Sequence, residues 1–238
     1  YDVRISCKRL LALIYKLRKK MKKLLSIISL LFFVTTFSAK AEMGIGITGA
    51  AHNIGGDGEE TTRSSGQVNK GSHDDTVVVP EIFVEMIADS GLTVGLSYIP
   101  TRDMGSKSRT DSNGEGDSGT YKAAAELDNV VQVYTDVALP MDVYGQSLYV
   151  KLGIQHATIA TLESLNSGST YPDEDVLGLT LGLGAKGDLP YGNNLYYKAE
   201  AAYTDFEDYE ENDEAGTGNK VTAELEDIAL KLSVGYKF

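Results

Sequence analysis

The last eleven residues, Ile228-Ala-Leu-Lys-Leu-Ser-Val-Gly-Tyr-Lys-Phe238, alternate between two kinds of side chain. Apolar side chains occupy every second position from Ile228 to Phe238, and small or charged side chains fill the positions between them. Because successive side chains of a β-strand point to opposite faces, this period of two predicts a strand whose faces meet different surroundings. The alternation continues to the terminal aromatic residue, whereas a poorly ordered chain end is not expected to show such a pattern.

Seven further segments show the same alternation of apolar and polar side chains. They are Gly44–His52, Val77–Ala88, Leu92–Ile99, Val130–Leu139, Leu148–Ile159, Leu177–Lys186 and Leu195–Phe206. The clearest is Leu177–Lys186, where leucine alternates with glycine and threonine. Alternating segments of about ten residues, separated by turn residues, are typical of transmembrane β-barrels. With the final segment the predicted strands number eight, which is an even number.

The gaps between these segments alternate in length. Three are short and contain the Gly, Pro or Asn typical of turns: Asp89–Gly91, Pro140–Ser147 and Leu189–Asn194. Four are long, acidic and rich in Gly and Ser: Ile54–Thr76, Pro100–Asn129, Ala160–Val176 and Glu207–Leu225. Such loops are expected to be solvated and mobile. Short turns at one end and long loops at the other predict an up-and-down barrel with both termini on the short-turn side, which in a bacterium is the periplasm.

Residues 21–41 have the layout of a secretory signal peptide. Met21-Lys-Lys is followed by an apolar run of 14 residues, Leu24–Phe37, and Ala39 and Ala41 stand at the −3 and −1 positions of a cleavage site. The run is shorter than the roughly 20 residues of a membrane-spanning helix, although an uncleaved anchor is the alternative. We expect residues 1–20 to lie upstream of the true start at Met21, and residues 42–238 to form the single mature domain.

Charge and cysteine content exclude several classes of protein. Residues 42–238 carry 12 Lys/Arg and 33 Asp/Glu, whereas residues 1–41 carry ten Lys/Arg and one acid. A body this acidic repels nucleic acid, which argues against DNA and RNA partners. The one cysteine, Cys7, lies in the N-terminal part, so no disulfide or cysteine-based metal site is possible downstream.

Export, eight segments, alternating gaps and a terminal aromatic residue make residues 42–238 resemble the eight-stranded outer-membrane barrels. These include the outer-membrane protein A transmembrane domain, the small X-type barrels and the opacity-type adhesins. The resemblance implies an all-β fold, an eight-stranded antiparallel up-and-down transmembrane β-barrel, preceded by a helical signal peptide and integral to the outer membrane of a Gram-negative bacterium. It also implies that Tyr236 and Phe238 belong to the signal read by the barrel-assembly machinery, and that outer-membrane lipid and lipopolysaccharide surround the barrel.

Periodicity alone fits both a soluble barrel with an apolar interior and a membrane barrel with an apolar exterior. The composition of the polar face distinguishes the two. That face combines many small residues with acids and lysines: Glu81, Glu85, Asp136, Lys151, Lys186, Lys198, Glu200 and Lys231. Glycine weakens a water-exposed strand, but small residues suit a narrow lumen in which acids and lysines pair. We therefore expect these residues to form structural ion pairs in a closed interior, with a proton or ion path as the alternative.

Two features depart from the usual barrel pattern. The sequence contains no Trp, so an aromatic girdle must come from residues near the segment ends: Tyr98, Tyr149, Tyr191, Tyr197, Tyr203, Tyr236 and Phe238. Pro80 lies inside the second segment, where a closed barrel has no edge at which a hydrogen bond can be omitted. We expect either a β-bulge at Pro80 or a membrane crossing made chiefly by Glu81–Ala88.

Candidate catalytic and metal-binding residues are few. His156-Ala-Thr158 with Glu163 faintly resembles the His-x-Ser plus Glu of lipid A deacylases, but Thr replaces the Ser nucleophile, so a rim histidine without a catalytic role is expected. Asp111–Gly116 matches the opening of an EF-hand loop, but Lys122 stands where a bidentate Glu is required. Loose divalent-cation binding there or at Asp205–Glu214 is an alternative to simple solvation. His52, His73 and His156 lack metal-ligand spacing.

These observations favour a non-enzymatic outer-membrane barrel without a cofactor, with a structural or surface-interaction role and long acidic extracellular loops. The alternatives are a small porin for ions or small solutes, a lipid A-modifying enzyme, and a soluble periplasmic barrel with a ligand inside.

Overall fold

The computed structural model describes residues 41–111, 119–162, 169–190 and 194–238. Residues 42–238 form a compact unit of their own. The signal peptide and the upstream extension expected over residues 1–41 fall outside the described residues, apart from Ala41. No helix within the described part of the chain has the length and apolarity needed to cross a membrane.

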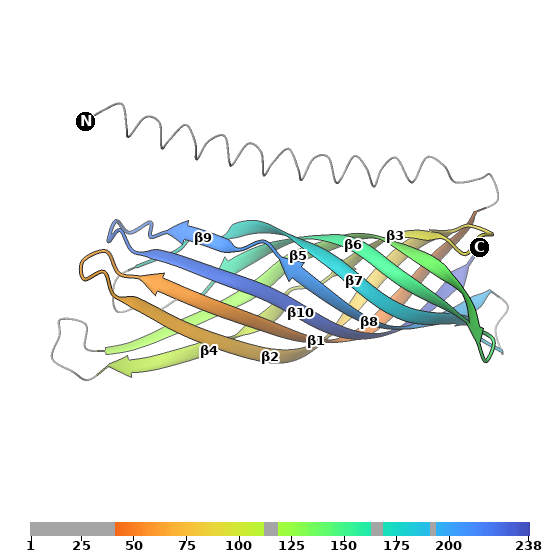
Figure 1. Ribbon diagram of the computed structural model, residues 1–238, viewed down its shortest axis with the longest axis horizontal. Helices are drawn as coiled ribbons and strands as arrows, with labels where there is room; N and C mark the ends of the chain where they lie inside the picture. Colours follow the sequence, from red (N-terminus) through yellow and green to blue (C-terminus); the bar gives the residue numbers. More distant parts are fainter. Residues whose placement is uncertain (1–40, 112–118, 163–168, 191–193) are drawn as a thin grey trace, which may run out of the picture. The chain divides into compact units, whose positions relative to one another are not determined.

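The barrel unit is built from antiparallel strands that close into a ring (Figure 1). The strands are β1 (Glu42–Thr61), β2 (Val68–Ile87), β3 (Thr93–Ile99), β4 (Arg102–Asp111), β5 (Gly119–Val143), β6 (Gln146–Thr161), β7 (Glu174–Asp188), β8 (Leu195–Phe206), β9 (Tyr209–Asn212) and β10 (Lys220–Lys237). β4 follows β3 along the edge of β5, and β9 follows β8 along the edge of β10, so the ring has eight positions. Each of the eight predicted segments lies in one of these positions, which confirms the predicted fold class.

The first and last strands close the ring. β1 pairs with β10 from Gly44↔Lys237 to Thr61↔Lys220, and with β2 from Glu42↔Ile87 to Thr61↔Val68. Closure satisfies backbone hydrogen-bonding groups that an open sheet would leave unpaired, which is what a lipid environment requires. The chain end and the short connections between strands lie at one end of the barrel, called the turn end, and the long hairpins lie at the other (Figure 1).

The two faces of the strands are distributed as the alternation predicts. Leu179, Leu181 and Leu183 are 56–67% exposed on the outside, whereas Lys198 and Glu200 are at most 7% exposed in the lumen. The outward apolar residues of the strands define an apolar belt. On β1, β5, β6, β7, β8 and β10 the next outward residue beyond this belt is polar, namely Asn53, Asn129, His156, Asp175, Asp205 and Glu226. An apolar belt bounded by polar residues is the lipid-facing surface expected of a membrane barrel.

The long gaps are not simple loops, which corrects the sequence prediction. β1, β2, β4, β5, β9 and β10 all continue into them, and this part of the barrel beyond the apolar belt is called the strand extension. Its tips are joined by hydrogen bonds: the Arg63 amide donates to Asn219 Oδ1 at 3.0 Å, and Asn219 Nδ2 donates to Ser169 Oγ at 3.1 Å. Glycine and acidic residues predicted loops, but continuous pairing with the neighbouring strands keeps the backbone extended.

Two smaller expectations also change. Pro80 pairs with Gly49 in an unbroken β1–β2 register, so the expected bulge is absent there. Instead, the β2–β3 ladder stops at Ile82↔Tyr98, so that Pro80 lies just beyond it. Tyr149 is fully buried in the lumen and is not part of an aromatic girdle, whereas Tyr98, Tyr203, Tyr236 and Phe238 are 40–67% exposed. Tyr191 lies outside the described residues.

Candidate functional site

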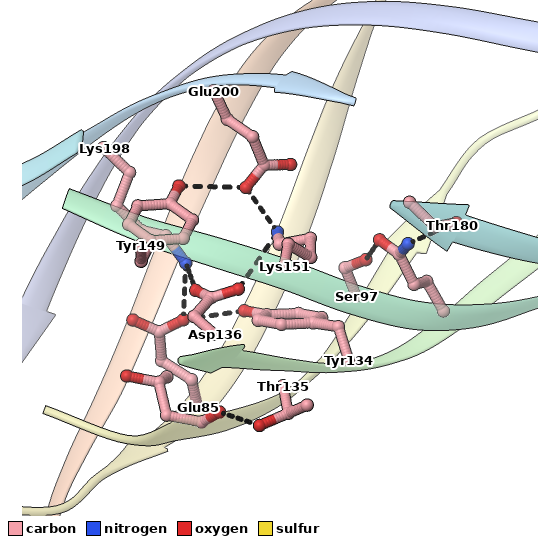
Figure 2. A network of polar contacts seen from close by, with 12 residues as sticks. Glu85, Ser97, Tyr134, Thr135, Asp136, Tyr149, Lys151, Thr180, Lys198 and Glu200 are labelled. Carbon is pink, nitrogen blue, oxygen red and sulfur yellow. Dashed lines mark hydrogen bonds and ion pairs between the residues drawn. The ribbon is translucent and has the colours of Figure 1, made fainter. Parts of the chain in front are cut away.

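The lumen near the turn end contains a buried charge network. Lys198 of β8 reaches two carboxylates from other strands, with Nζ 2.6 Å from Asp136 Oδ2 and 3.0 Å from Glu85 Oε2. All three side chains point inward because their positions alternate with the lipid-facing residues of β8, β5 and β2. Figure 2 shows Lys198 between the two acids, with Lys151 on the other side of Asp136.

The remaining lysines of the polar face lie in the same region. Lys151 Nζ is 2.7 Å from Glu200 Oε2 and 3.8 Å from Asp136 Oδ1. Lys231 Nζ is 2.7 Å from Glu81 Oε1. Lys186 differs, because its Nζ donates to the Gly91 carbonyl at 3.1 Å and to Thr93 Oγ1 at 2.9 Å. The structure therefore places all eight sequence-predicted lumen residues inside the barrel, seven of them in ion-pair contact and Lys186 in neutral contacts.

Tyrosines complete the network, and the sequence did not assign them to it. The Tyr134 hydroxyl donates to Glu85 Oε2 at 2.7 Å, and the Tyr149 hydroxyl donates to Glu200 Oε2 at 2.9 Å (Figure 2). The Tyr196 hydroxyl donates to Glu85 Oε1 at 2.8 Å. The rings of Tyr134 and Tyr149 also lie near ammonium groups: Lys151 Nζ is 4.0 Å from the centre of the Tyr134 ring, and Lys198 Nζ is 5.3 Å from the centre of the Tyr149 ring. A charged hydrogen bond and a cation–π contact both favour the ionised acids and lysines in the interior.

Two more polar layers lie farther from the turn end. In the first, Gln132 Nε2 and Gln155 Nε2 both donate to Thr180 Oγ1, at 3.0 and 3.2 Å. In the second, His52 Nδ1 lies 2.8 Å from Asp227 Oδ2, and Arg102 Nη2 lies 3.3 Å from the same oxygen. These second-layer residues were missed because Arg102 and Asp227 fall in or beside predicted loops. Had the strands been predicted to extend this far, the alternation of side chains would have placed Arg102 and Asp227 on the lumen face.

An apolar cluster follows, inside the strand extension. Its buried members include Ile54, Ile99, Leu127, Val130, Ala157, Ile159, Tyr171, Val176, Phe206, Tyr209 and Leu225. Polar layers toward the turn end and an apolar layer beyond them therefore stack along the lumen. Tyr134, Tyr149, Gln132 and Gln155 are among the largest fully buried side chains. Side chains therefore fill the lumen within the apolar belt, as expected for a barrel of eight strands.

The other candidate residues do not assemble into a recognisable site. His156 Nε2 lies 3.9 Å from Asp175 Oδ2, and Thr158 donates to Asp175 Oδ1 at 2.8 Å, so a carboxylate separates the imidazole from the hydroxyl. Glu163 and residues 112–118 of the EF-hand-like loop lie outside the described residues. The described residues hold no group of three or more His, Cys, Asp or Glu side chains arranged to bind a metal ion.

No protein-family model and no curated protein sequence matches the chain. The outer membrane protein OprG from Pseudomonas aeruginosa is similar in structure, with a TM-score of 0.54 at 19% identity, covering 84% of this chain and 97% of OprG. AlkL, an outer membrane protein studied in lipid bilayers, covers 85% of this chain and 95% of its own, at 13% identity and a TM-score of 0.44. The attachment invasion locus protein Ail of Yersinia pestis covers 81% and 99%, at 13% identity and a TM-score of 0.35.

The match to OprG agrees with the closed ring of antiparallel strands and identifies the fold. The chain has the fold of a small outer-membrane β-barrel.

Proposed function

We propose that this protein is a non-enzymatic, non-conducting barrel of the outer membrane that acts through the strand extension it holds outside the cell. The observation that carries the proposal is the filled lumen. Within the apolar belt, Lys198, Asp136 and Tyr134 are at most 4% exposed and contact side chains of other strands. Moving an ion through this region would require breaking charge-assisted contacts in a low-dielectric interior, which is costly. The small-porin alternative is therefore less well supported.

The strand extension offers the surface through which the protein would act. Outward carboxylates such as Asp57 and Glu210 make it acidic, in keeping with the net acidity of residues 42–238. An acidic field favours cationic partners and repels anionic ones. In this proposal both ends of the mature chain are periplasmic, Tyr236 and Phe238 are read during assembly, and lipid and lipopolysaccharide surround the apolar belt.

Planar-bilayer recordings test the absence of conduction. The purified protein is expected to insert and give no steady, stepwise openings, whereas a well-defined single-channel conductance would overturn that part of the proposal. Insertion is verified in the same sample by heat-modifiable gel mobility. Protease added to intact cells tests the orientation: cleavage in the 62–67 hairpin, with an epitope tag after Phe238 left intact, is the expected result. Loss of the tag with the hairpin preserved would place the extension in the periplasm.

A further inference from the structure

The strand extension contains an open cavity of about 500 Å³ next to the apolar cluster. Ile54, Ile159, Leu225, Tyr171 and Tyr209 of that cluster line it. The volume falls within the roughly 300–1,000 Å³ typical of small-molecule pockets. It lies beyond the polar residues that end the apolar belt, so it is separate from the charge network of the turn end.

The cavity exists because inward positions of β1 carry no side chain. Ile54, Gly56 and Gly58 follow one another on the lumen face, and both glycines line the cavity. A Cβ atom added at Gly56 or Gly58 would have its nearest neighbours 3.8 Å away, an ordinary contact distance. Ala223, on β10 beside β1, is also small and also lines the cavity. Larger residues would fit the backbone at Gly56 and Gly58 and would fill the space.

The lining favours apolar carbon over a charged group. The hydroxyl groups of its two tyrosines are already used inside the protein: Tyr171 donates to Glu60 Oε1 at 3.1 Å, and Tyr209 donates to the Pro172 carbonyl at 2.7 Å. Because these hydroxyl groups are already hydrogen-bonded inside the protein, the rings are the part of both residues that would contribute contact surface. The polar part of the lining includes Glu59, Glu60 and Glu224. Lys70, which also lines the cavity, lies 2.8 Å from Glu59, so its charge is offset there.

We infer that this cavity binds a small, uncharged, hydrocarbon-rich molecule taken up from the outer side of the membrane. Apolar rings and aliphatic side chains supply the contact surface, and the carboxylates at the cavity disfavour anionic amphiphiles by charge repulsion. The inference goes beyond the proposed function, because binding in the strand extension does not depend on whether the lumen within the belt conducts ions.

The test uses the full chain in lipid nanodiscs and the uncharged fluorescent probe N-phenyl-1-naphthylamine, with empty nanodiscs as reference. Wild-type protein is expected to add a saturable signal of one probe per barrel to the linear partition into lipid. The Gly56→Leu/Gly58→Leu double variant is expected to lose the saturable signal. The matched control is Gly49→Leu on the same strand, where an added Cβ meets nothing within 4 Å, and it should bind like the wild type.

Two results would overturn the inference: purely linear partition with the wild-type protein, or saturable binding that survives in the folded double variant. Equal saturable binding of the anionic probe 1-anilinonaphthalene-8-sulfonate would contradict the assignment to uncharged ligands. Heat-modifiable mobility reports folding of each variant. Where the double variant does not fold, Gly58→Leu alone replaces it, and the wild-type titration decides the question of binding independently of either variant.

Discussion

Lys198 Nζ lies 2.6 Å from Asp136 Oδ2, and both side chains are less than 5% exposed although the two residues stand on different strands and 62 positions apart. The pair joins β8 to β5 across the lumen, and a second carboxylate, Glu85 of β2, contacts the same ammonium group at 3.0 Å. One cation thus connects three strands that are not neighbours in the ring. The surrounding tyrosines shield this contact from water.

Removing the charge of Lys198 should destabilise the barrel strongly. Lys198→Met leaves Glu85 buried without its cation and leaves Asp136 with only the more distant Lys151 at 3.8 Å, and breaking a buried ion pair costs about 3–5 kcal/mol. Because the chain has no Trp, the measurement is a urea titration in lipid vesicles read by heat-modifiable mobility. The control is Lys237→Met, whose partner Asp188 is 76% exposed; there the change should be about 0–1 kcal/mol. Equal midpoints for the two variants would contradict a stabilising role for the buried network.

A methyl group at Gly95 should be poorly tolerated. The Tyr134 ring lies over this glycine, and an added Cβ would be 2.3 Å from Tyr134 Cζ. Gly95→Ala forces the ring to move and should cost roughly 1–3 kcal/mol of unfolding free energy. Gly49→Ala, where the added Cβ has open space, serves as the control in the same urea titration. In a Tyr134→Leu background the cost of Gly95→Ala should fall, because the clashing ring is gone; a purely additive double variant would argue against the contact.

A charge on the lipid face should be costly only within the apolar belt. Leu181 is 56% exposed and lies near the middle of the belt segment of β7, so Leu181→Lys is expected to cost about 2–4 kcal/mol in a bilayer. Asp57→Lys in the strand extension also introduces a lysine at an exposed position and should change stability by less than about 0.5 kcal/mol. Comparable losses from the two variants would show that the belt does not face lipid.

The fold could be predicted because each strand carries its own signal. Alternation depends only on which face a side chain occupies, so Leu177–Lys186 and Ile228–Phe238 indicated strands without knowledge of their neighbours. Because Lys198 and Glu200 stand two positions apart on one strand, the same alternation placed both on the polar face. Their partners were less accessible, because which acid meets which lysine depends on the register and tilt of distant strands.

Beyond the apolar belt the sequence signal failed for a physical reason. Outside lipid neither face of a strand has to be apolar, so the extensions of β1 and β10 look like acidic loops although they are paired to Thr61↔Lys220. Arg102 comes just after β3, which ends at Ile99, and it lies in a predicted loop, yet its guanidinium reaches the buried Asp227. Such contacts follow from tertiary pairing, so the inward-facing positions of Arg102 and Asp227 can be recognised only once the strand extensions are known.

Asp213 should hold the tips of the strand extension together in a pH-dependent way. Its Oδ1 accepts the Thr170 amide hydrogen at 2.7 Å, and its Oδ2 accepts the Thr217 amide hydrogen at 2.6 Å. Desolvation opposes ionisation, but these hydrogen bonds outweigh it and lower the pKa of Asp213 to about 2. Because the pKa is lowered in the folded state, the stabilisation is complete above the unfolded value of about 4 and is lost as the pH falls through about 2.

Hydrogen exchange at the Thr217 amide measures this contact. At pH 6 we expect Asp213→Asn to exchange there faster than the wild type, because a neutral amide oxygen accepts hydrogen bonds more weakly than a carboxylate. Glu214→Gln, next in the chain and exposed, is the matched control and should leave the Thr217 rate unchanged. The difference between Asp213→Asn and wild type should shrink as the pH is lowered toward 2, since the wild-type carboxylate then becomes neutral as well. A difference that stays constant from pH 6 to pH 2 would contradict an ionised Asp213 as the source of the order in this hairpin.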